Sequence, residues 1–336
     1  MSKVYFVKID EIEKIKNLLP EFIAPLGVKV HFGERGCETF VPAKLVNEIT
    51  DLVADSTFIE TSVLYKSPRQ TAAGHEGVAQ EHGFNFLPFD FLDGEVGDNC
   101  SEVQINSQSS YTQALEHKHF QKCYLGKNLE KYKSLLVISH FKGHLGVGFG
   151  GAIKNIGMGL ACRRGKLAIH SSIKHQIKKE KCISCGECIA HCPVNAIAFD
   201  QDKKAFIDQN ICISCSKCIS VCPQGAVRIP WDSVGKIDLE ERLAEYAFAS
   251  QLNKQCFYIN FLINITNDCD CLGKRMEKII DDIGVLVSSD PVAIDQASYN
   301  LVLEKNPEFK IHAGDNQLRH AESLGMGSRE YELINY

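Results

Sequence analysis

The sequence lacks any apolar run close to the roughly eighteen residues that a membrane-spanning helix requires, so we expect no membrane contact. It also lacks a secretory signal, because Met1 to Lys16 alternates apolar and charged residues, and we therefore expect a cytoplasmic protein. An excess of basic residues is absent too. With 37 Lys and Arg against 42 Asp and Glu, the formal net charge is -5, which argues against nucleic acid as a partner.

Cysteine, in contrast, is abundant, with 15 residues in a chain of 336. Thiols in a protein without a secretory signal usually stay reduced, and metal ligation or redox chemistry is then their common use. We therefore expect a soluble metal protein without disulfides. The hydrophobic content of 44% over this length is enough for a substantial core and more than one domain.

Eight of the cysteines form an internal repeat. The pattern Cys-x2-Cys-x2-Cys-x3-Cys-Pro begins at Cys182 and again at Cys212, 30 residues later. This spacing is typical of bacterial ferredoxins with two [4Fe–4S] clusters, in which the last cysteine of each half binds the cluster of the other half. The predicted ligands of the first cluster are Cys182, Cys185, Cys188 and Cys222. Those of the second cluster are Cys212, Cys215, Cys218 and Cys192.

A pair of zinc sites is the alternative, because zinc also binds Cys-x2-Cys. Zinc ribbons, however, pair two such knuckles and need neither a third cysteine at the same step nor the following Cys-Pro. The repeat therefore favours iron–sulfur clusters and electron transfer.

Short apolar runs rich in β-branched residues occur on both sides of the repeat and predict strands. They span Val4 to Ile9, Val28 to Phe32, Phe58 to Leu64, Leu135 to Ser139, Phe257 to Ile263 and Ile283 to Val287. Helical patterns cover Pro42 to Ala54, Asp238 to Leu252 and Pro291 to Leu303, the last with Asp290 as its capping residue.

Strands that alternate with helices indicate an α/β fold with a mainly parallel sheet. We expect one α/β domain that is discontinuous in sequence, with a small inserted α+β ferredoxin-like module. The predicted parts are 1–176 and 232–336 for the α/β domain and 177–231 for the insert.

A basic, glycine-rich segment extends from Lys131 to Lys179, where eight Lys, two Arg and eight Gly occur without one Asp or Glu. Gly146, Gly148 and Gly151 match G-x-G-x-x-G, but the acidic residue that a dinucleotide site needs about twenty residues later is missing. We prefer a loop whose backbone amides bind a carboxylate or phosphate.

The basic residues expected to assist the amides are Lys154, Arg163 and Lys166. The alternative is a solvated basic face that docks a partner protein. His140 and His144 in the same segment are further candidates for a site, although histidines at such spacing are often structural.

Cys269-Asp270-Cys271 follows a predicted strand, and in extended chain the two thiols point to the same side. They are candidates to contact a metal, a substrate or a redox partner, whereas the other cysteines outside the repeat are expected to be small buried residues. Loops after successive parallel strands meet at one edge of a sheet. We therefore expect the loops at His31, Thr61, His140 and Cys269 to surround one electropositive pocket.

The sequence resembles the iron–sulfur family called domain of unknown function 362. The resemblance is carried by Lys29–Glu34, Ser139–His144, Gly150–Gly159, Asp268–Cys271, Ser289–Asp295 and Ala321–Glu332. It covers nearly the whole chain and implies an inserted ferredoxin-like repeat, as in many members. Because the family carries no established reaction, the resemblance names no substrate.

Three functions follow as hypotheses. In the first, two [4Fe–4S] clusters pass electrons to or from a small anionic substrate in the α/β domain, as in an oxidoreductase of anaerobic metabolism. The candidate contact residues are then His140, His144, Lys154, Cys269 and Cys271. In the second, the protein is a non-enzymatic electron carrier whose α/β domain docks a redox partner protein. A role in cluster assembly or regulation is a third, weaker hypothesis.

Overall fold

The computed structural model describes residues 1–105, 118–171, 175–212, 215, 217–228, 234–312 and 314–336. Its largest element is a sheet of eight strands. Their order is β16 (Tyr331–Asn335), β1 (Ser2–Val7), β15 (Gly284–Ser288), β14 (Gln255–Leu262), β7 (Ser134–His140), β2 (Leu26–Val30), β3 (Ser56–Glu60) and β4 (Phe89–Phe91). Within this sheet β15 runs against the other seven strands, so the sheet is mixed but mainly parallel.

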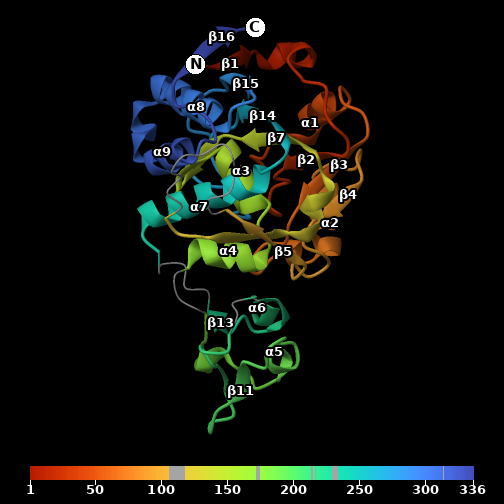
Figure 1. The fold of residues 1–336 in the computed structure, drawn as a ribbon, viewed down its shortest axis with the longest axis vertical. Helices are drawn as coiled ribbons and strands as arrows, with labels where there is room; N and C mark the ends of the chain where they lie inside the picture. The colour runs from red at the N-terminus through yellow and green to blue at the C-terminus, as the bar shows by residue number, and fades with distance from the viewer. Residues whose placement is uncertain (106–117, 172–174, 213–214, 216, 229–233, 313) are drawn as a thin grey trace.

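Helices cover both faces of the sheet, which gives three layers with two apolar cores (Figure 1). One face carries α3 (Ala152–Gly159), α7 (Lys236–Gln251), α8 (Pro291–Lys305) and α9 (Asp315–Ser323). The other face carries the 3-10 helix η1 (Ile9–Asn17), α1 (Ala43–Thr50) and α2 (Ala72–Glu81). The α/β fold predicted from the sequence is therefore confirmed. None of the described helices combines the length and the apolar character that crossing a membrane would require.

The six sequence-predicted strands are all present, with shifted ends. Strand β7 is buried along its entire length, as its apolar run predicts for a central parallel strand. The run that begins at Phe58 was expected to continue to Leu64, but β3 ends at Glu60. It ends there because Ser62 turns away to donate its amide to the buried carboxylate of Asp93.

The three predicted helices are also found, as α1, α7 and α8. Helix α8 begins as expected, since the side chain of Asp290 accepts hydrogen bonds from the amides of Val292 and Ala293, each at 2.8 Å. The loops between β7 and α3 form a hairpin of β8 (Lys142–His144) and β9 (Gly148–Gly150). His140 and His144 therefore lie on strands.

The segment after α4 (Arg163–His170) forms a small lobe below the sheet in Figure 1. Its elements are β10 (Gln176–Ile177), α5 (Glu187–Ala190), β11 (Ile197–Phe199), β12 (Ala205–Ile207), α6 (Lys217–Val221) and β13 (Val227–Arg228). It has an apolar cluster of its own, and β10 pairs with β13, so the chain enters and leaves side by side. The predicted end of the insert at Trp231 lies outside the described residues, and the division of the chain into domains stays a prediction.

Candidate functional site

A cavity of about 220 Å³ opens where the carboxyl ends of β2, β3 and β7 meet the loop after β14. The four loops that the sequence placed around one pocket all contribute to its wall, through His31, Thr61, His140 and Cys269. The remaining candidates, His144, Lys154 and Cys271, line the same cavity. This volume fits a small molecule rather than a dinucleotide, whose pockets are usually larger.

The wall of the cavity is electropositive. Five Lys and Arg side chains line it against a single carboxylate, Glu60. Three of the five have a buried acidic partner within 3.5 Å: Lys29 with Glu60, Lys142 with Asp270, and Arg69 with Glu34. In the described part of the chain, Lys154 and Lys166 form no such ion pair. The positive charge of Lys166 is thus available to a ligand, whereas Nζ of Lys154 lies 3.4 Å from the sulfur of Cys269.

Asp270 organises one side of the cavity. One of its oxygens, Oδ2, lies 2.8 Å from both Nδ1 of His140 and Nζ of Lys142, and the other accepts a hydrogen bond from Thr39. Burial by itself raises the pKa of Asp270, but the adjacent His140 and Lys142 hold it well below its usual range. The other ring nitrogen of His140 lies 2.8 Å from the carbonyl oxygen of Ile263. Both ring nitrogens of His140 thus face hydrogen-bond acceptors, which fixes the orientation of the ring.

Cys269 is surrounded by hydrogen-bond donors. Nζ of Lys154 donates to its sulfur at 3.4 Å, and the side chains of Cys271 and His144 also bond to it. Nδ1 of His144 accepts from backbone amides, so the proton is on Nε2. The hydrogen bond from Cys271, together with Lys154 and His144, lowers the pKa of Cys269 well below that of a free thiol. Burial opposes this shift. Cys269 is the thiolate of the pair, because the pKa of Cys271 is raised by the same contact.

Sequence reasoning did not find Arg69, which is 1% exposed and lines the cavity. Its guanidinium lies 3.1 Å from Nε2 of His31 and donates to the carbonyl oxygen of Gly33 and to Tyr65. No motif marks this residue. Lys29 was also missed as a site residue, although a lysine inside the apolar strand β2 is a signal that could have found it. Its ammonium group donates to Asn155 on α3.

The backbone amides expected to bind an anion already have a partner. At the start of α3, the amides of Ala152 and Ile153 donate to the two carboxylate oxygens of Asp295, at 2.7 and 2.9 Å. A Cβ at Gly151 would lie 2.3 Å from the same carboxylate, so this glycine permits the close approach. The expectation of an amide-bound anion at this turn was therefore wrong, and the G-x-G-x-x-G match serves an internal contact.

Of the three basic residues expected to assist such an anion, two face the cavity. Lys154 and Lys166 line it, and burial lowers the pKa of Lys166 to about 8. Arg163 is not among the lining residues, since its guanidinium donates to the carbonyl oxygen of Val96. Ligand binding by charge therefore depends on the two lysines.

The cysteines of the repeat line two hollows in the small lobe. The first hollow is lined by Cys182, Cys185, Cys188 and Cys222. The second is lined by Cys192, Cys212, Cys215 and Cys218. Each set combines three thiols of one half with the last thiol of the other half, which is the grouping that crossed ligation requires. Two equivalent amides, those of Ala196 and Ala226, donate to the sulfurs of Cys192 and Cys222 at 3.2 Å.

The thiols of the two cysteine sets are farther apart than the ligands of a single bound zinc ion. A tetrahedral zinc ion with Zn–S bonds of about 2.3 Å would hold its sulfurs about 3.8 Å apart. Among the described residues, the group of three ligand atoms found within 4.8 Å of one another is His119, Asp238 and Glu241, and neither cysteine set is drawn together so tightly.

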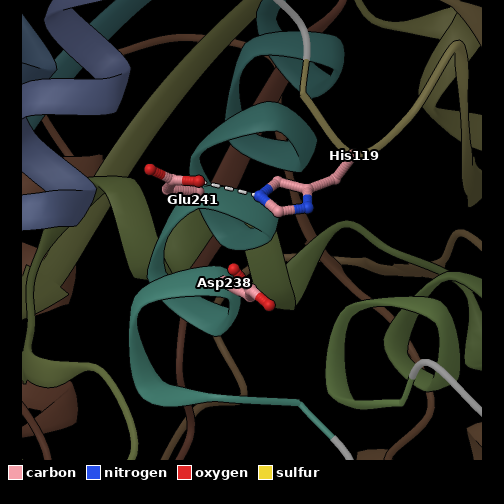
Figure 2. Close-up of side chains that lie close together, drawn as sticks. All are labelled: His119, Asp238 and Glu241. Atoms are coloured by element: carbon pink, nitrogen blue, oxygen red, sulfur yellow. Dashed lines mark hydrogen bonds and ion pairs between the residues drawn. The ribbon is translucent and has the colours of Figure 1, made fainter.

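The group at His119 is explained by ion pairs (Figure 2). Nε2 of His119 lies 2.8 Å from one oxygen of Glu241, and Nζ of Lys118 lies 2.9 Å from the other. Asp238 beside them is exposed, in the first turn of α7, where a carboxylate stabilises the helix. Nothing in this cluster calls for a metal.

Cys100 and Cys162 form a disulfide, with their Cα atoms 5.8 Å apart. The expectation of a chain without disulfides was therefore wrong. The two residues lie 62 positions apart, and the contact depends on the hairpin of β5 (Cys100–Gln104) and β6 (Lys122–Gly126). Cys162 reaches that hairpin because its amide donates to the carbonyl oxygen of Tyr124 in β6. No spacing in the sequence marks such a pair.

Comparison with known families adds a decisive match. The model of the family described as Domain of unknown function (DUF362) matches residues 26–300, which is most of the chain. The chain belongs to the DUF362 family. The family match includes the strands that build the cavity and the small lobe, and it confirms the resemblance predicted from the sequence.

Individual relatives of this DUF362 protein are distant. An uncharacterised polyferredoxin-like protein of Methanocaldococcus jannaschii is 62% identical over 26 residues, which are 8% of this chain and 16% of that protein. A lactate racemase apoprotein of Thermoanaerobacterium thermosaccharolyticum is 13% identical, with a TM-score of 0.40 over 91% of this chain. A Thermotoga maritima protein is 11% identical, with a TM-score of 0.41 over 88% of this chain. The chain spans 58% of the length of each of these two structures.

Proposed function

We propose that this DUF362 protein is an iron–sulfur oxidoreductase that moves electrons between two [4Fe–4S] clusters in the small lobe and a small anionic substrate in the cavity. The observation that carries the proposal is the division of the eight repeat cysteines into two hollows of four thiols each. The short likeness to a polyferredoxin-like protein supports the same chemistry. When bound, the clusters would supply single electrons at low potential.

The cavity residues have separate tasks in this proposal. Lys154 and Lys166 bind the anionic group, since the other lining cations are paired with buried carboxylates. Lys154 shares its charge between this group and the sulfur of Cys269. Asp270 fixes the positions of His140 and Lys142 in the wall of the cavity. Cys269 presents a thiolate to the ligand, and the donors around it maintain that charge state.

Metal analysis tests the cluster part of the proposal. Anaerobically purified protein should contain about eight iron and eight sulfide per chain. Stoichiometric zinc in a colourless protein would contradict it.

Anion binding tests the cavity part, with inorganic phosphate and acetate as probes in calorimetric titrations. Lys154→Ala should weaken binding by roughly ten- to a hundredfold, as loss of a charged hydrogen bond of about 1.5–3 kcal/mol predicts. Iron content should stay unchanged. Lys44→Ala, which removes an exposed lysine of α1, is the matched control. If neither anion binds the wild-type protein, the non-enzymatic carrier becomes the better hypothesis.

A further inference from the structure

The Cys100–Cys162 disulfide lies between the second cysteine set and the cavity. On the side of the small lobe, Asp98, two residues before Cys100, accepts an ion pair from Lys217 at 2.7 Å. Lys217 is the residue directly before the predicted ligand Cys218. The loop that would hold the second cluster thus contacts the chain next to the disulfide.

On the side of the cavity, the neighbour of Cys162 makes the contacts. The carbonyl oxygen of Ala161 accepts hydrogen bonds from Thr61 at 2.9 Å and from Lys166 at 2.7 Å. Both of these side chains line the cavity. Arg163, on the other side of Cys162, packs against Gly97. A Cβ at Gly97 would lie 2.4 Å from Cδ of Arg163. The disulfide is therefore joined to both sites by short contacts, which are buried on the cavity side and exposed on the side of the small lobe.

The surroundings of the two sulfur atoms differ. Cys162 is fully buried at the N-cap of α4, where the positive end of a helix stabilises a thiolate. Cys100 is partly exposed, which gives solvent protons access to the pair. A reversible disulfide needs this asymmetry. When the bond breaks, the buried sulfur is released as a thiolate, and the other sulfur is accessible from solvent.

From this placement we infer that Cys100 and Cys162 form a redox-active disulfide that accepts two electrons from the reduced clusters. The inference rests on the proposed iron–sulfur function. The sulfur–sulfur bond breaks as two electrons arrive, one from each of two reduced [4Fe–4S] clusters, which are oxidised. Two protons from solvent complete the two thiols. Two one-electron donors thereby match one two-electron acceptor, and the pair stores both electrons beside the cavity.

An anaerobic coulometric titration of the full-length protein counts the electrons. Wild-type protein should take up about four per chain, one for each cluster and two for the disulfide. The double variant Cys100→Ala, Cys162→Ala should take up about two at unchanged iron content. Cys256→Ala, which removes a thiol outside both sites, should keep the wild-type value.

Mass spectrometry of alkylated peptides gives a second measurement that needs no disulfide variant. After titration, Cys100 and Cys162 should carry alkyl groups, whereas before it they should be joined. In Cys215→Ala, which lacks a ligand of the nearer cluster, they should remain joined under the same reductant. A dithiol in air-exposed protein would overturn the inference. Uptake of only two electrons by wild-type protein with full iron content would also overturn the inference. That result would leave the proposed function standing. Protein without iron would overturn both.

Discussion

Lys142 and Asp270 form a buried ion pair, with Nζ 2.8 Å from Oδ2, although 128 positions separate them in the chain. The pair joins the hairpin after β7 to the loop after β14. Removing the carboxylate leaves Lys142 and the ring of His140 without their shared acceptor. Asp270→Asn should therefore destabilise the fold by about 3–5 kcal/mol, measured by urea unfolding at pH 7.

The same variant has a defined pH dependence. Because the folded protein lowers the pKa of Asp270, this group stabilises the fold above the ordinary aspartate pKa of about 4, and the contribution is lost as the pH falls below it. The difference in unfolding free energy between wild type and variant should therefore become smaller as the pH falls below about 4. Asp281→Asn removes a fully exposed carboxylate and should change stability by less than about 1 kcal/mol. A difference that grows with acid would contradict the assignment.

Gly159 is the last residue of α3 and lies next to the ammonium group of Lys29. A Cβ at this position would lie 2.3 Å from Cε of Lys29, so Gly159→Ala should push that side chain away from Glu60. We expect a loss of about 1–3 kcal/mol in urea unfolding. Gly77→Ala is the matched control, because its Cβ meets nothing within 4 Å in α2, and it should stabilise by about 0.5–1 kcal/mol. Equal effects of the two substitutions would show that the contact at Lys29 is unimportant.

Cys269 should react with iodoacetamide at pH 7 faster than Cys37, whose pKa is raised by burial. Lys154→Ala removes one donor to the Cys269 thiolate and should slow its labelling by roughly tenfold, as expected for a pKa increase on the order of one unit. Peptide mass spectrometry over a pH series measures both rates. Labelling of Cys269 that begins only near pH 9 would show that the donors do not hold a thiolate.

Crossed ligation predicts how cysteine substitutions combine. Cys192→Ala should lower the iron content from about eight to about four per chain. Adding Cys215→Ala should cost no further iron, because both residues serve the same cluster, whereas adding Cys185→Ala should remove the rest. Iron and sulfide analysis measures these losses. If Cys185→Ala costs no further iron and Cys215→Ala removes the rest, each half of the repeat holds its own cluster.

The α/β domain should fold without the small lobe. Arg242 on α7 donates to the carbonyl oxygens of Ala168 and Ser171 at the end of α4, so the helices before and after the lobe contact each other directly. A shortened chain in which a Gly/Ser linker replaces residues 177–231 should be soluble, iron-free and cooperative in thermal unfolding. Insolubility of this chain would show that the lobe is part of the core.

The sequence predicted those features that depend on local pattern. Buried central strands such as β7 are continuous apolar runs, and loops after parallel strands meet at one edge, so His31, Thr61, His140 and Cys269 could be placed together. Contacts between distant segments could not be predicted. Asp295 bonds to Ala152 from 143 positions away, and no pattern in either segment encodes the meeting. Arg69 is held in the cavity by the 3-10 helix Pro68–Gln70, where its carbonyl oxygen accepts from the amide of Val63 after β3.

The contact between Arg242 and the end of α4 has an evolutionary consequence. It joins the helices before and after the small lobe at the point where the lobe departs from the sheet. We therefore predict that replacement or loss of the lobe during descent leaves the geometry of the cavity intact. If the proposed function is correct, the source of electrons and the choice of substrate can change independently among relatives.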